Sequence, residues 1–228
     1  LVLLISCGLM IRPFQALRNG QPGFVRPEEV LTLRISIPEA EIADDEKAVR
    51  THEQIMHRIE QVPGVMSVGL TTSITMDGWD SNDPVSFEDF PAPEGQLPAI
   101  RRFKFISPNY FGTMGNPILA GRDFNWTDLY NKAPIAIISE PLAREYWKDA
   151  AQAVGKRIRS MPKNPWREIV GVVGREHDDG VHRKATTMVY WPMLMANFWE
   201  EKLYAQRAMA YAIRSRRAGN PSFFGEIQ

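Results

Sequence analysis

Residues 31–70 read LTLRISIPEAEIADDEKAVRTHEQIMHRIEQVPGVMSVGL, and the periodicity of this stretch sets the architecture that we expect. Apolar and polar side chains alternate from residue 31 to residue 37, which is the period of a half-buried β-strand. Pro38 ends that run. Residues 45–61 then carry apolar side chains at helical spacing, at Ala48, Ile55, Met56, Ile59 and Val62. The stretch therefore predicts a strand followed by an amphipathic helix.

The ends of this helix carry the residues that begin and end helices. Asp44 or Asp45 can cap its first turn, and the acidic cluster Asp44-Asp45-Glu46 is explained by the favourable dipole at a helix N-terminus. Pro63-Gly64 stops the helix, and a second strand follows over residues 65–70. Because a helix joins the two strands, we expect them to lie parallel in one sheet with a right-handed crossover, as a βαβ unit.

The middle of the chain predicts mainly β-structure. Residues 77–98 are rich in Asp, Pro, Gly and Ser, as loops are, with one short strand over 85–87. Short helices are expected over 110–114 and 140–147, the second with Ser139 as its cap and Pro141 in its first turn. Further strands are expected over residues 101–106, 118–119, 135–138, 156–159, 168–173 and 188–191. A strand over 209–214 and the start of a helix in NPSFFGEIQ, residues 220–228, follow.

Composition describes a folding chain with no charge bias. Its 228 residues are 44% apolar and 24% charged, and 27 basic residues balance 27 acidic ones. Nucleic-acid binding needs a basic excess or stripe, and the basic residues gather only in short clusters such as Arg214, Arg216 and Arg217. One cysteine excludes an internal disulfide and a CxxC metal site. No nucleic-acid partner is therefore predicted.

The first eleven residues are almost wholly apolar and have two interpretations. Leu4-Ile5-Ser6-Cys7 has the form of a lipoprotein processing box, in which Cys7 would receive lipid. Alternatively, the segment is the outer end of a membrane helix. By itself it is too short to cross a membrane, because a spanning helix needs roughly 20 apolar residues. A lipidated cysteine leads into a polar tether, whereas the apolar run here continues to Ile11. We expect the truncated transmembrane helix, and the lipidation of Cys7 stays open.

Six motifs occur in a characteristic order along the chain. They are residues 22–33, the turn and strand of residues 63–70, SPNYFGTMGNPILAGRDF at 107–124, AIISEPLAREYW at 136–147, VGKRI at 154–158 and WREIVGVVG at 166–174. Together they resemble the MacB-like periplasmic core domain of ABC transporter permeases of the MacB/FtsX class. The resemblance covers nearly the whole chain.

The resemblance implies an α+β fold with two lobes. One lobe is built on the βαβ unit, which is half of a ferredoxin-like arrangement, and a β-rich second lobe is inserted after it. The expected boundaries are residues 1–18 for the periplasmic end of a truncated transmembrane helix, 19–76 for the first βαβ part, 77–205 for the inserted lobe, and 206–228 for the start of a second, truncated βαβ part.

The resemblance also implies a mechanical function. Such a domain would be non-enzymatic and would couple ATP-driven motion in the membrane to work, or to partner or substrate binding, in the periplasm. The implied location is the bacterial inner membrane, and the implied partners are a cytoplasmic ATPase subunit, a second permease copy in a dimer, and a periplasmic adaptor or lipoprotein. The alternative is a stand-alone, membrane-anchored binding or sensor module. Whether the full protein carries one core domain or two stays open, as do its cargo and the direction of transport.

No residue is predicted to be catalytic, cofactor-binding or metal-binding. The chain has no GxxxxGK[ST] motif to hold a nucleotide phosphate. His177-Asp178-Asp179-Gly180-Val181-His182 could hold a metal, but a polar turn explains it better. Ser139 lacks the GxSxG elbow of a hydrolase nucleophile, and helix capping accounts for it.

Two further residue pairs have a structural interpretation. His52 and His57 are five positions apart, so they do not share a helix face, and a solvated helix surface is the expected place for both. Gly171 and Gly174 lack the spacing of a dinucleotide loop, so close packing or a bulge is expected there. Residues 77–98 and 174–187 are the predicted contact surfaces, because loops on a rigid scaffold often carry recognition.

Overall fold

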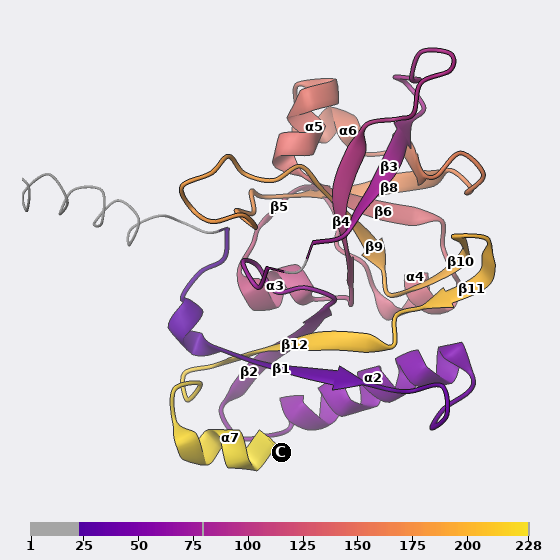
Figure 1. The fold of residues 1–228 in the computed structure, drawn as a ribbon. Coiled ribbons are helices and arrows are strands. Elements are labelled where there is room, and N and C mark those ends of the chain that lie inside the picture. The colour runs from indigo at the N-terminus through magenta and orange to yellow at the C-terminus, as the bar shows by residue number, and fades with distance from the viewer. Residues whose placement is uncertain (1–22, 79, 228) are drawn as a thin grey trace, which may run out of the picture.

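The computed structural model describes residues 23–78 and 80–227 of the chain. Figure 1 shows a sheet with one long helix at the bottom and a larger group of strands and short helices above it. The lower part is formed by β1 (Val30–Ser36), α2 (Asp45–Glu60), β2 (Val65–Thr71), β12 (Ala208–Ser215) and α7 (Pro221–Ile227), with the short 3-10 turn η1 (Pro27–Glu29) before β1. The expected α+β fold is confirmed.

Strands β1 and β2 lie parallel in one sheet, as predicted, but they are not neighbours. The order is β1-β12-β2, and β12 pairs antiparallel with both. The C-terminal strand therefore fills the centre of the sheet that the βαβ unit starts. Segments from opposite ends of the chain form this sheet, so its stability depends on both of them.

Helix α2 forms where the spacing predicts it. Asp44 caps the helix by accepting a hydrogen bond from the Lys47 backbone N–H at 2.6 Å. The helix buries one stripe of residues, Ala48, Val49, His52, Met56 and Ile59, and it packs against β2. The predicted cap is confirmed, and Ala48, Met56 and Ile59 of the predicted apolar face are buried, whereas Ile55 and Val62 are half-buried.

The upper part contains nine strands and four short helices among the described residues. Its elements are β3 (Asn82–Phe87), β4 (Ile100–Ile106), α3 (Tyr110–Met114), β5 (Ile118–Gly121), α4 (Trp126–Tyr130), β6 (Ile135–Ser139), α5 (Glu140–Trp147), α6 (Ala150–Ala153), β7 (Arg157–Ser160), β8 (Arg167–Val173), β9 (Met188–Pro192), β10 (Leu194–Phe198) and β11 (Glu201–Ala205). Every strand and helix expected over residues 77–205 is present. The expectation of only two helices was wrong, and the β10–β11 hairpin and α4 and α6 were not anticipated.

The two parts join along a narrow seam. Strands β2 and β4 pair at Thr71 and Ile106 alone, after which the sheet continues through β3, β7, β8, β6 and β9. Ser107 reinforces the seam, because its Oγ accepts from the Leu70 backbone N–H at 2.9 Å. Helix α3 of the upper part packs against β2 and β12. The lobe boundaries at residues 76/77 and 205/206 stay predictions.

Ser139 does not cap α5 with its side chain, so that interpretation was wrong. Its backbone occupies the cap position, but its buried hydroxyl makes no capping hydrogen bond. Instead, Oγ accepts from the Met188 backbone N–H at 2.9 Å and donates to the Thr186 carbonyl at 3.2 Å. Met188 is the first residue of the neighbouring strand β9. The Ser139 hydroxyl therefore binds the start of β9 instead of the first turn of α5.

Gly171 is required by close packing, as expected. A Cβ at this position would lie 2.2 Å from the Arg122 carbonyl oxygen, which no side chain can tolerate. Gly171 also lies beside the register shift between β6 and β8.

The predicted membrane segment, residues 1–18, and Cys7 within it lie outside the described residues. Within residues 23–78 and 80–227, no helix has both the length and the apolar character of a membrane span.

His52 is buried in the structure, so its predicted place on a solvated surface was wrong. It is four positions from both Ala48 and Met56 and therefore shares their buried face. Its Nε2 donates to the Arg207 carbonyl at 3.0 Å, and Nδ1 accepts from the Tyr211 hydroxyl at 2.7 Å. Burial lowers the pKa of His52, although the hydrogen bond to Arg207 acts in the opposite direction. His57, by contrast, is exposed and lies beside Glu53 and Glu60.

The buried His52 predicts a loss of stability in acid. The unfolded chain binds a proton at His52 more readily than the folded chain does, so the stability is present above the ordinary histidine pKa and falls as pH drops below it. His52→Gln should remove this part of the pH dependence, which amounts to at most about 1.4 kcal/mol per pH unit. Urea unfolding between pH 7.5 and 5 measures it.

The matched control is His57→Gln, which alters an exposed imidazole on the same helix. The change in the slope of stability against pH should be larger for His52→Gln than for this control. Identical pH profiles for His52→Gln and the unmodified chain would contradict the assignment.

Candidate functional site

A cluster of buried charges lies in the upper part, next to the seam. Lys104 on β4 is 1% exposed and Glu176, in the segment after β8, is 2% exposed. Asp178, Thr75 and Tyr190 complete this group, which we call the Lys104 cluster. Fully buried lysine and glutamate side chains are rare and occur where they are paired.

The contacts within the Lys104 cluster satisfy both buried charges. The Lys104 ammonium donates to Glu176 Oε1 and, at 2.8 Å, to Asp178 Oδ1. Glu176 also accepts from the Thr75 hydroxyl at 2.6 Å and from the Tyr190 hydroxyl. Every member is therefore held by at least one charge-assisted hydrogen bond.

The pKa shifts of Lys104 and Glu176 both favour the ionised forms. Burial alone would lower the pKa of Lys104, but the charges of Glu176 and Asp178 raise it above its usual value. Burial would likewise raise the pKa of Glu176, yet Lys104 holds it below the usual range. Burial raises the pKa of Tyr190 well above its ordinary value, and the charge of Glu176 adds to that effect, so its hydroxyl keeps its proton and acts as a donor.

The Lys104 cluster connects segments that are far apart in the sequence. Thr75 follows β2 of the lower part, Lys104 and Tyr190 lie on the parallel neighbours β4 and β9, and Glu176 follows β8. Glu176 therefore ties the loop after β2 to two strands of the upper part. The arrangement can hold the two parts together.

A second buried cation holds the start of the described chain. Arg214 on β12 is 5% exposed, and its guanidinium donates to the Thr113 carbonyl at 2.6 Å and the Met114 carbonyl at 3.1 Å, both in α3. It also donates to the Val25 carbonyl at 2.8 Å and lies 3.3 Å from Glu29. We call residues 23–29 the N-terminal arm. One side chain thus joins the arm, the central strand of the lower sheet and α3.

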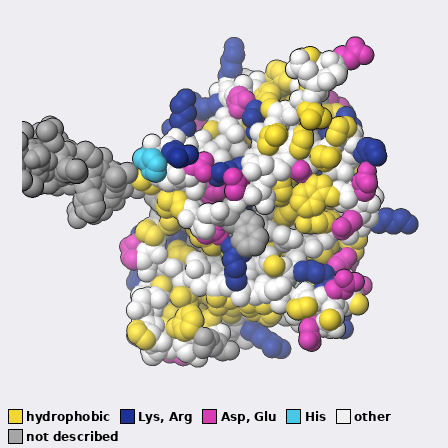
Figure 2. Space-filling model, in the orientation of Figure 1, with side chains coloured by type: hydrophobic (Ala, Val, Ile, Leu, Met, Phe, Trp, Pro, Cys, Tyr) yellow, Lys and Arg dark blue, Asp and Glu magenta, His cyan; other side chains and the backbone are white. Residues whose placement is uncertain are grey.

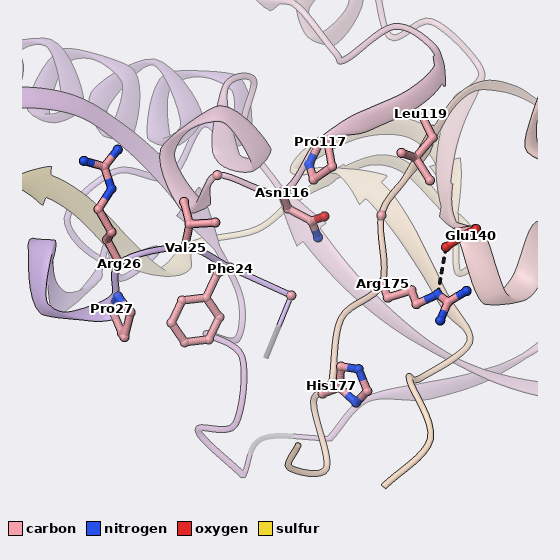
Figure 3. Close-up of a pocket in the computed structure, with 13 residues that line it drawn as sticks. Phe24, Val25, Arg26, Pro27, Asn116, Pro117, Leu119, Glu140, Arg175 and His177 are labelled. Carbon is pink, nitrogen blue, oxygen red and sulfur yellow. Dashed lines mark hydrogen bonds and ion pairs between the residues drawn. The ribbon is translucent and has the colours of Figure 1, made fainter. Parts of the chain in front are cut away.

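A cavity of about 680 Å³ lies beside this joint. The N-terminal arm forms one wall, and the turn after α3 and the segment after β8 form the others. Figure 3 shows Phe24 on one side, facing Asn116, Arg175 and His177. Arg175 Nε donates to Glu140 at 2.9 Å at the rim. The lining is mixed apolar and polar.

The acidic residues of the metal-like run His177 to His182 have partners within the protein. Among the described residues, no group of three or more His, Cys, Asp or Glu side chains could hold an ion. Asp178 binds Lys104, and Asp179 lies 2.8 Å from Arg102. Gly180, which follows Asp179, takes a positive φ of 100°. The acidic side chains therefore serve ion pairs within the protein.

The three residues of the acidic cluster at the start of α2 have different partners. Asp44 caps the helix, Asp45 lies 2.7 Å from Arg207, and Glu46 pairs with both Arg50 and Lys132. The dipole explanation therefore covers only part of its role.

Sequence reasoning missed both Lys104 and Arg214. Lys104 alternates with Phe103 and Phe105 on a strand, which is also the pattern of a half-exposed strand. Arg214 lies close to Arg216 and Arg217 in the sequence, so the three residues were interpreted together as a short basic cluster. Arg216 is exposed and Arg217 pairs with Glu226, so only Arg214 points into the core.

Comparison with known proteins identifies the family. Residues 10–216 match the sequence profile of the MacB-like periplasmic core domain. The chain belongs to the MacB-like periplasmic core domain family. Among curated protein sequences, none matches this chain significantly.

Solved structures of MacB-like and related domains resemble this MacB-like core domain at low sequence identity. The periplasmic region of MacB from Actinobacillus actinomycetemcomitans aligns with a TM-score of 0.52 and 10% identity, covering 90% of this chain and 81% of that one. The extracellular domain of the noncanonic ABC-type transporter YknZ from Gram-positive bacteria gives 0.48 and 14%, covering 85% and 87%. A domain of a putative permease protein from Porphyromonas gingivalis gives 0.45 and 19%, covering 72% and 67%. The MacB match shows the shared fold.

Breaking the Lys104 cluster should destabilise the MacB-like core domain strongly. Lys104→Met leaves Glu176 charged and buried without its cation, which typically costs about 3–5 kcal/mol of unfolding free energy. Lys163→Met, at a side chain that is 84% exposed, should change stability by less than about 0.5 kcal/mol. Denaturant unfolding measures both.

The double variant Lys104→Met/Glu176→Gln separates pairing from packing. Neutralising Glu176 should recover part of the stability that Lys104→Met loses. Equal or lower stability of the double variant would show that Glu176 does not depend on Lys104.

Proposed function

We propose that this chain is a non-enzymatic extracytoplasmic domain of an ABC-type permease in the bacterial inner membrane. It couples ATP-driven motion in the membrane to work, or to partner or substrate binding, in the periplasm. Family membership favours this function over a stand-alone anchored sensor module. The observation that carries the coupling is the attachment of the N-terminal arm to the core by Arg214.

The arm is the route by which motion reaches the core. Residues 1–18, the proposed end of a membrane helix, precede it in the chain. A displacement of the arm at Val25 acts on the Arg214 guanidinium and on the backbone hydrogen bond from Val25 N–H to the Met114 carbonyl, 3.0 Å long. Arg214 belongs to β12, which pairs with both β1 and β2. The pull is therefore distributed over a whole sheet and over α3.

The Lys104 cluster extends this connection into the upper part. Because Glu176 binds Thr75, Lys104 and Tyr190 together, the loop after β2 cannot move without the strands β4 and β9. Buried, fully paired polar networks rigidify the structure around them. The domain would then move as one body, which suits the transmission of a mechanical displacement.

A non-enzymatic function is supported by the roles of the candidate chemical groups. Ser139 is buried and bound to the backbone of Thr186 and Met188, so it is not presented to a substrate. The acidic residues Glu176 and Asp178 are occupied by Lys104.

The proposed partners follow from the permease function. A cytoplasmic ATPase subunit would act through the membrane part, and a second permease copy would form a dimer. A periplasmic adaptor or lipoprotein would contact the exposed loops.

The test measures motion of the domain within the permease that carries it, purified with its ATPase. A spin label at Leu97→Cys, where the side chain is 81% exposed, is introduced in a Cys7→Ser background. Distances between the labels of two copies are measured with and without ATP. We expect ATP to shift the distance distribution, and we expect Arg214→Met to abolish or broaden the shift while the permease remains folded.

Arg216→Met is the matched control, since Arg216 is two residues away but exposed. It should leave the ATP-dependent shift intact. Two results oppose the proposal: a distribution that ATP leaves unchanged in the unmodified permease, or a shift that survives Arg214→Met unaltered.

A further inference from the structure

Residues 175–184, REHDDGVHRK, form a loop whose cations are more exposed than its carboxylates; we call it the basic loop. Two of its three acidic side chains face inward, and the third, Asp179, is 35% exposed. Glu176 and Asp178 are almost fully buried and bind Lys104, and Asp179 lies 2.8 Å from Arg102. All three carboxylates are therefore paired with the two cations of strand β4, Lys104 and Arg102.

The cationic side chains of the same loop face outward. Arg183 and Lys184 are exposed, and neither has an ion-pair partner among the residues that the structure describes. Arg175 is 59% exposed, although Glu140 binds its Nε. The ten residues contain as many acidic side chains as Lys and Arg side chains. Because the Lys and Arg side chains are the more exposed, the outer face of the loop is positive.

The basic loop lies directly against the N-terminal arm. A Cβ on Gly23 would lie 2.1 Å from the Arg175 carbonyl oxygen, so the two backbones touch there. Figure 2 shows a histidine gathered with several Lys or Arg side chains, and with some Asp or Glu side chains beside them, where the described chain begins. Five peptide steps separate Gly23 from residue 18, the proposed end of the membrane helix, and these span at most about 18 Å.

Exposed apolar side chains accompany the basic loop. Val25 is 48% exposed and Leu119 is 46% exposed, and both line the cavity that Arg175 and His177 also line. A positive face flanked by exposed apolar groups suits the boundary between headgroups and acyl chains.

We propose that the outer face of the basic loop docks on the anionic phospholipid headgroups of the membrane surface. This proposal rests on the proposed membrane attachment of residues 1–18. Arg183 and Lys184 would bind the phosphate oxygens, with Arg175 beside them. Docking would fix the tilt of the core relative to the membrane, so that a movement of the arm becomes a movement of the whole domain.

Vesicle binding of the 228-residue chain tests the proposal. Arg183→Gln/Lys184→Gln is titrated with vesicles of equal parts phosphatidylglycerol and phosphatidylcholine, and with pure phosphatidylcholine. Each basic residue near an anionic surface is worth roughly a fivefold change in affinity. We expect the double variant to bind the anionic vesicles roughly 25-fold more weakly. Its binding to pure phosphatidylcholine should equal that of the unmodified chain.

Two further variants make the test specific. Lys163→Gln/Lys202→Gln removes the same charge from exposed positions near the β10–β11 hairpin, and it should bind like the unmodified chain. Glu140→Gln removes the carboxylate that neutralises Arg175, and it should strengthen binding to anionic vesicles by up to roughly fivefold.

The outcomes separate the basic loop from the membrane anchor. Binding to pure phosphatidylcholine reports on residues 1–18 and hence on the proposed attachment alone, because all variants share that segment. Unchanged anionic binding of Arg183→Gln/Lys184→Gln would overturn the docking proposal and point to an acidic protein surface instead. An equal loss in Lys163→Gln/Lys202→Gln would also overturn it, since the attraction would then depend on net charge alone.

Discussion

The burial of Lys104 with Glu176 is the constraint on which the rest of the structure depends. Removing two charges from water costs several kcal/mol for each ion, and the cost is offset only when the pair has close geometry and further hydrogen bonds. Thr75, Tyr190 and Asp178 supply those hydrogen bonds. Four separate segments must therefore be in place at once for the pair to be stable. The interaction selects one relative position of the loop after β2, the strands β4 and β9, and the segment after β8.

Arg214 is a second buried cation that holds separate segments together, on the lower side of the seam. Three of its four partners are backbone carbonyls, so replacing a side chain in the arm would not release it. Side chains on β12 alternate between the two faces of the sheet: Tyr211 contacts His52 of α2, and Arg214 contacts α3 on the other side. One strand thus connects both layers that cover it. This construction supports our proposal that the domain transmits force.

The local periodicities predicted most of the elements, because an element that is buried on one face carries apolar residues at a regular spacing. Strands β1 and β2 and helix α2 have this spacing. The position of β12 between β1 and β2 could not be predicted in this way, since antiparallel pairing between strands more than 130 residues apart has no local signal. The β10–β11 hairpin was missed because Asn197, Trp199 and Glu200 make its turn with positive φ, and the last two rarely do so.

The candidate site was the least predictable part, because it depends on which face of an element meets the core. His52 carried a usable signal, its spacing of four from Ala48 and Met56. Lys104 carried none, because a lysine that alternates with Phe103 and Phe105 is equally compatible with a solvated strand face. Its partners Glu176 and Asp178 are more than 70 residues away, and only the tertiary structure brings them together.

Both parts of the domain should behave as one cooperative body. Native-state hydrogen exchange tests this most directly, by comparing the opening free energies of backbone amides in β12 and in β8 as denaturant is added. We expect the most protected amides of the two strands to open with the same free energy and the same denaturant dependence. Exchange of β12 through an opening of lower free energy, with β8 still protected, would contradict it.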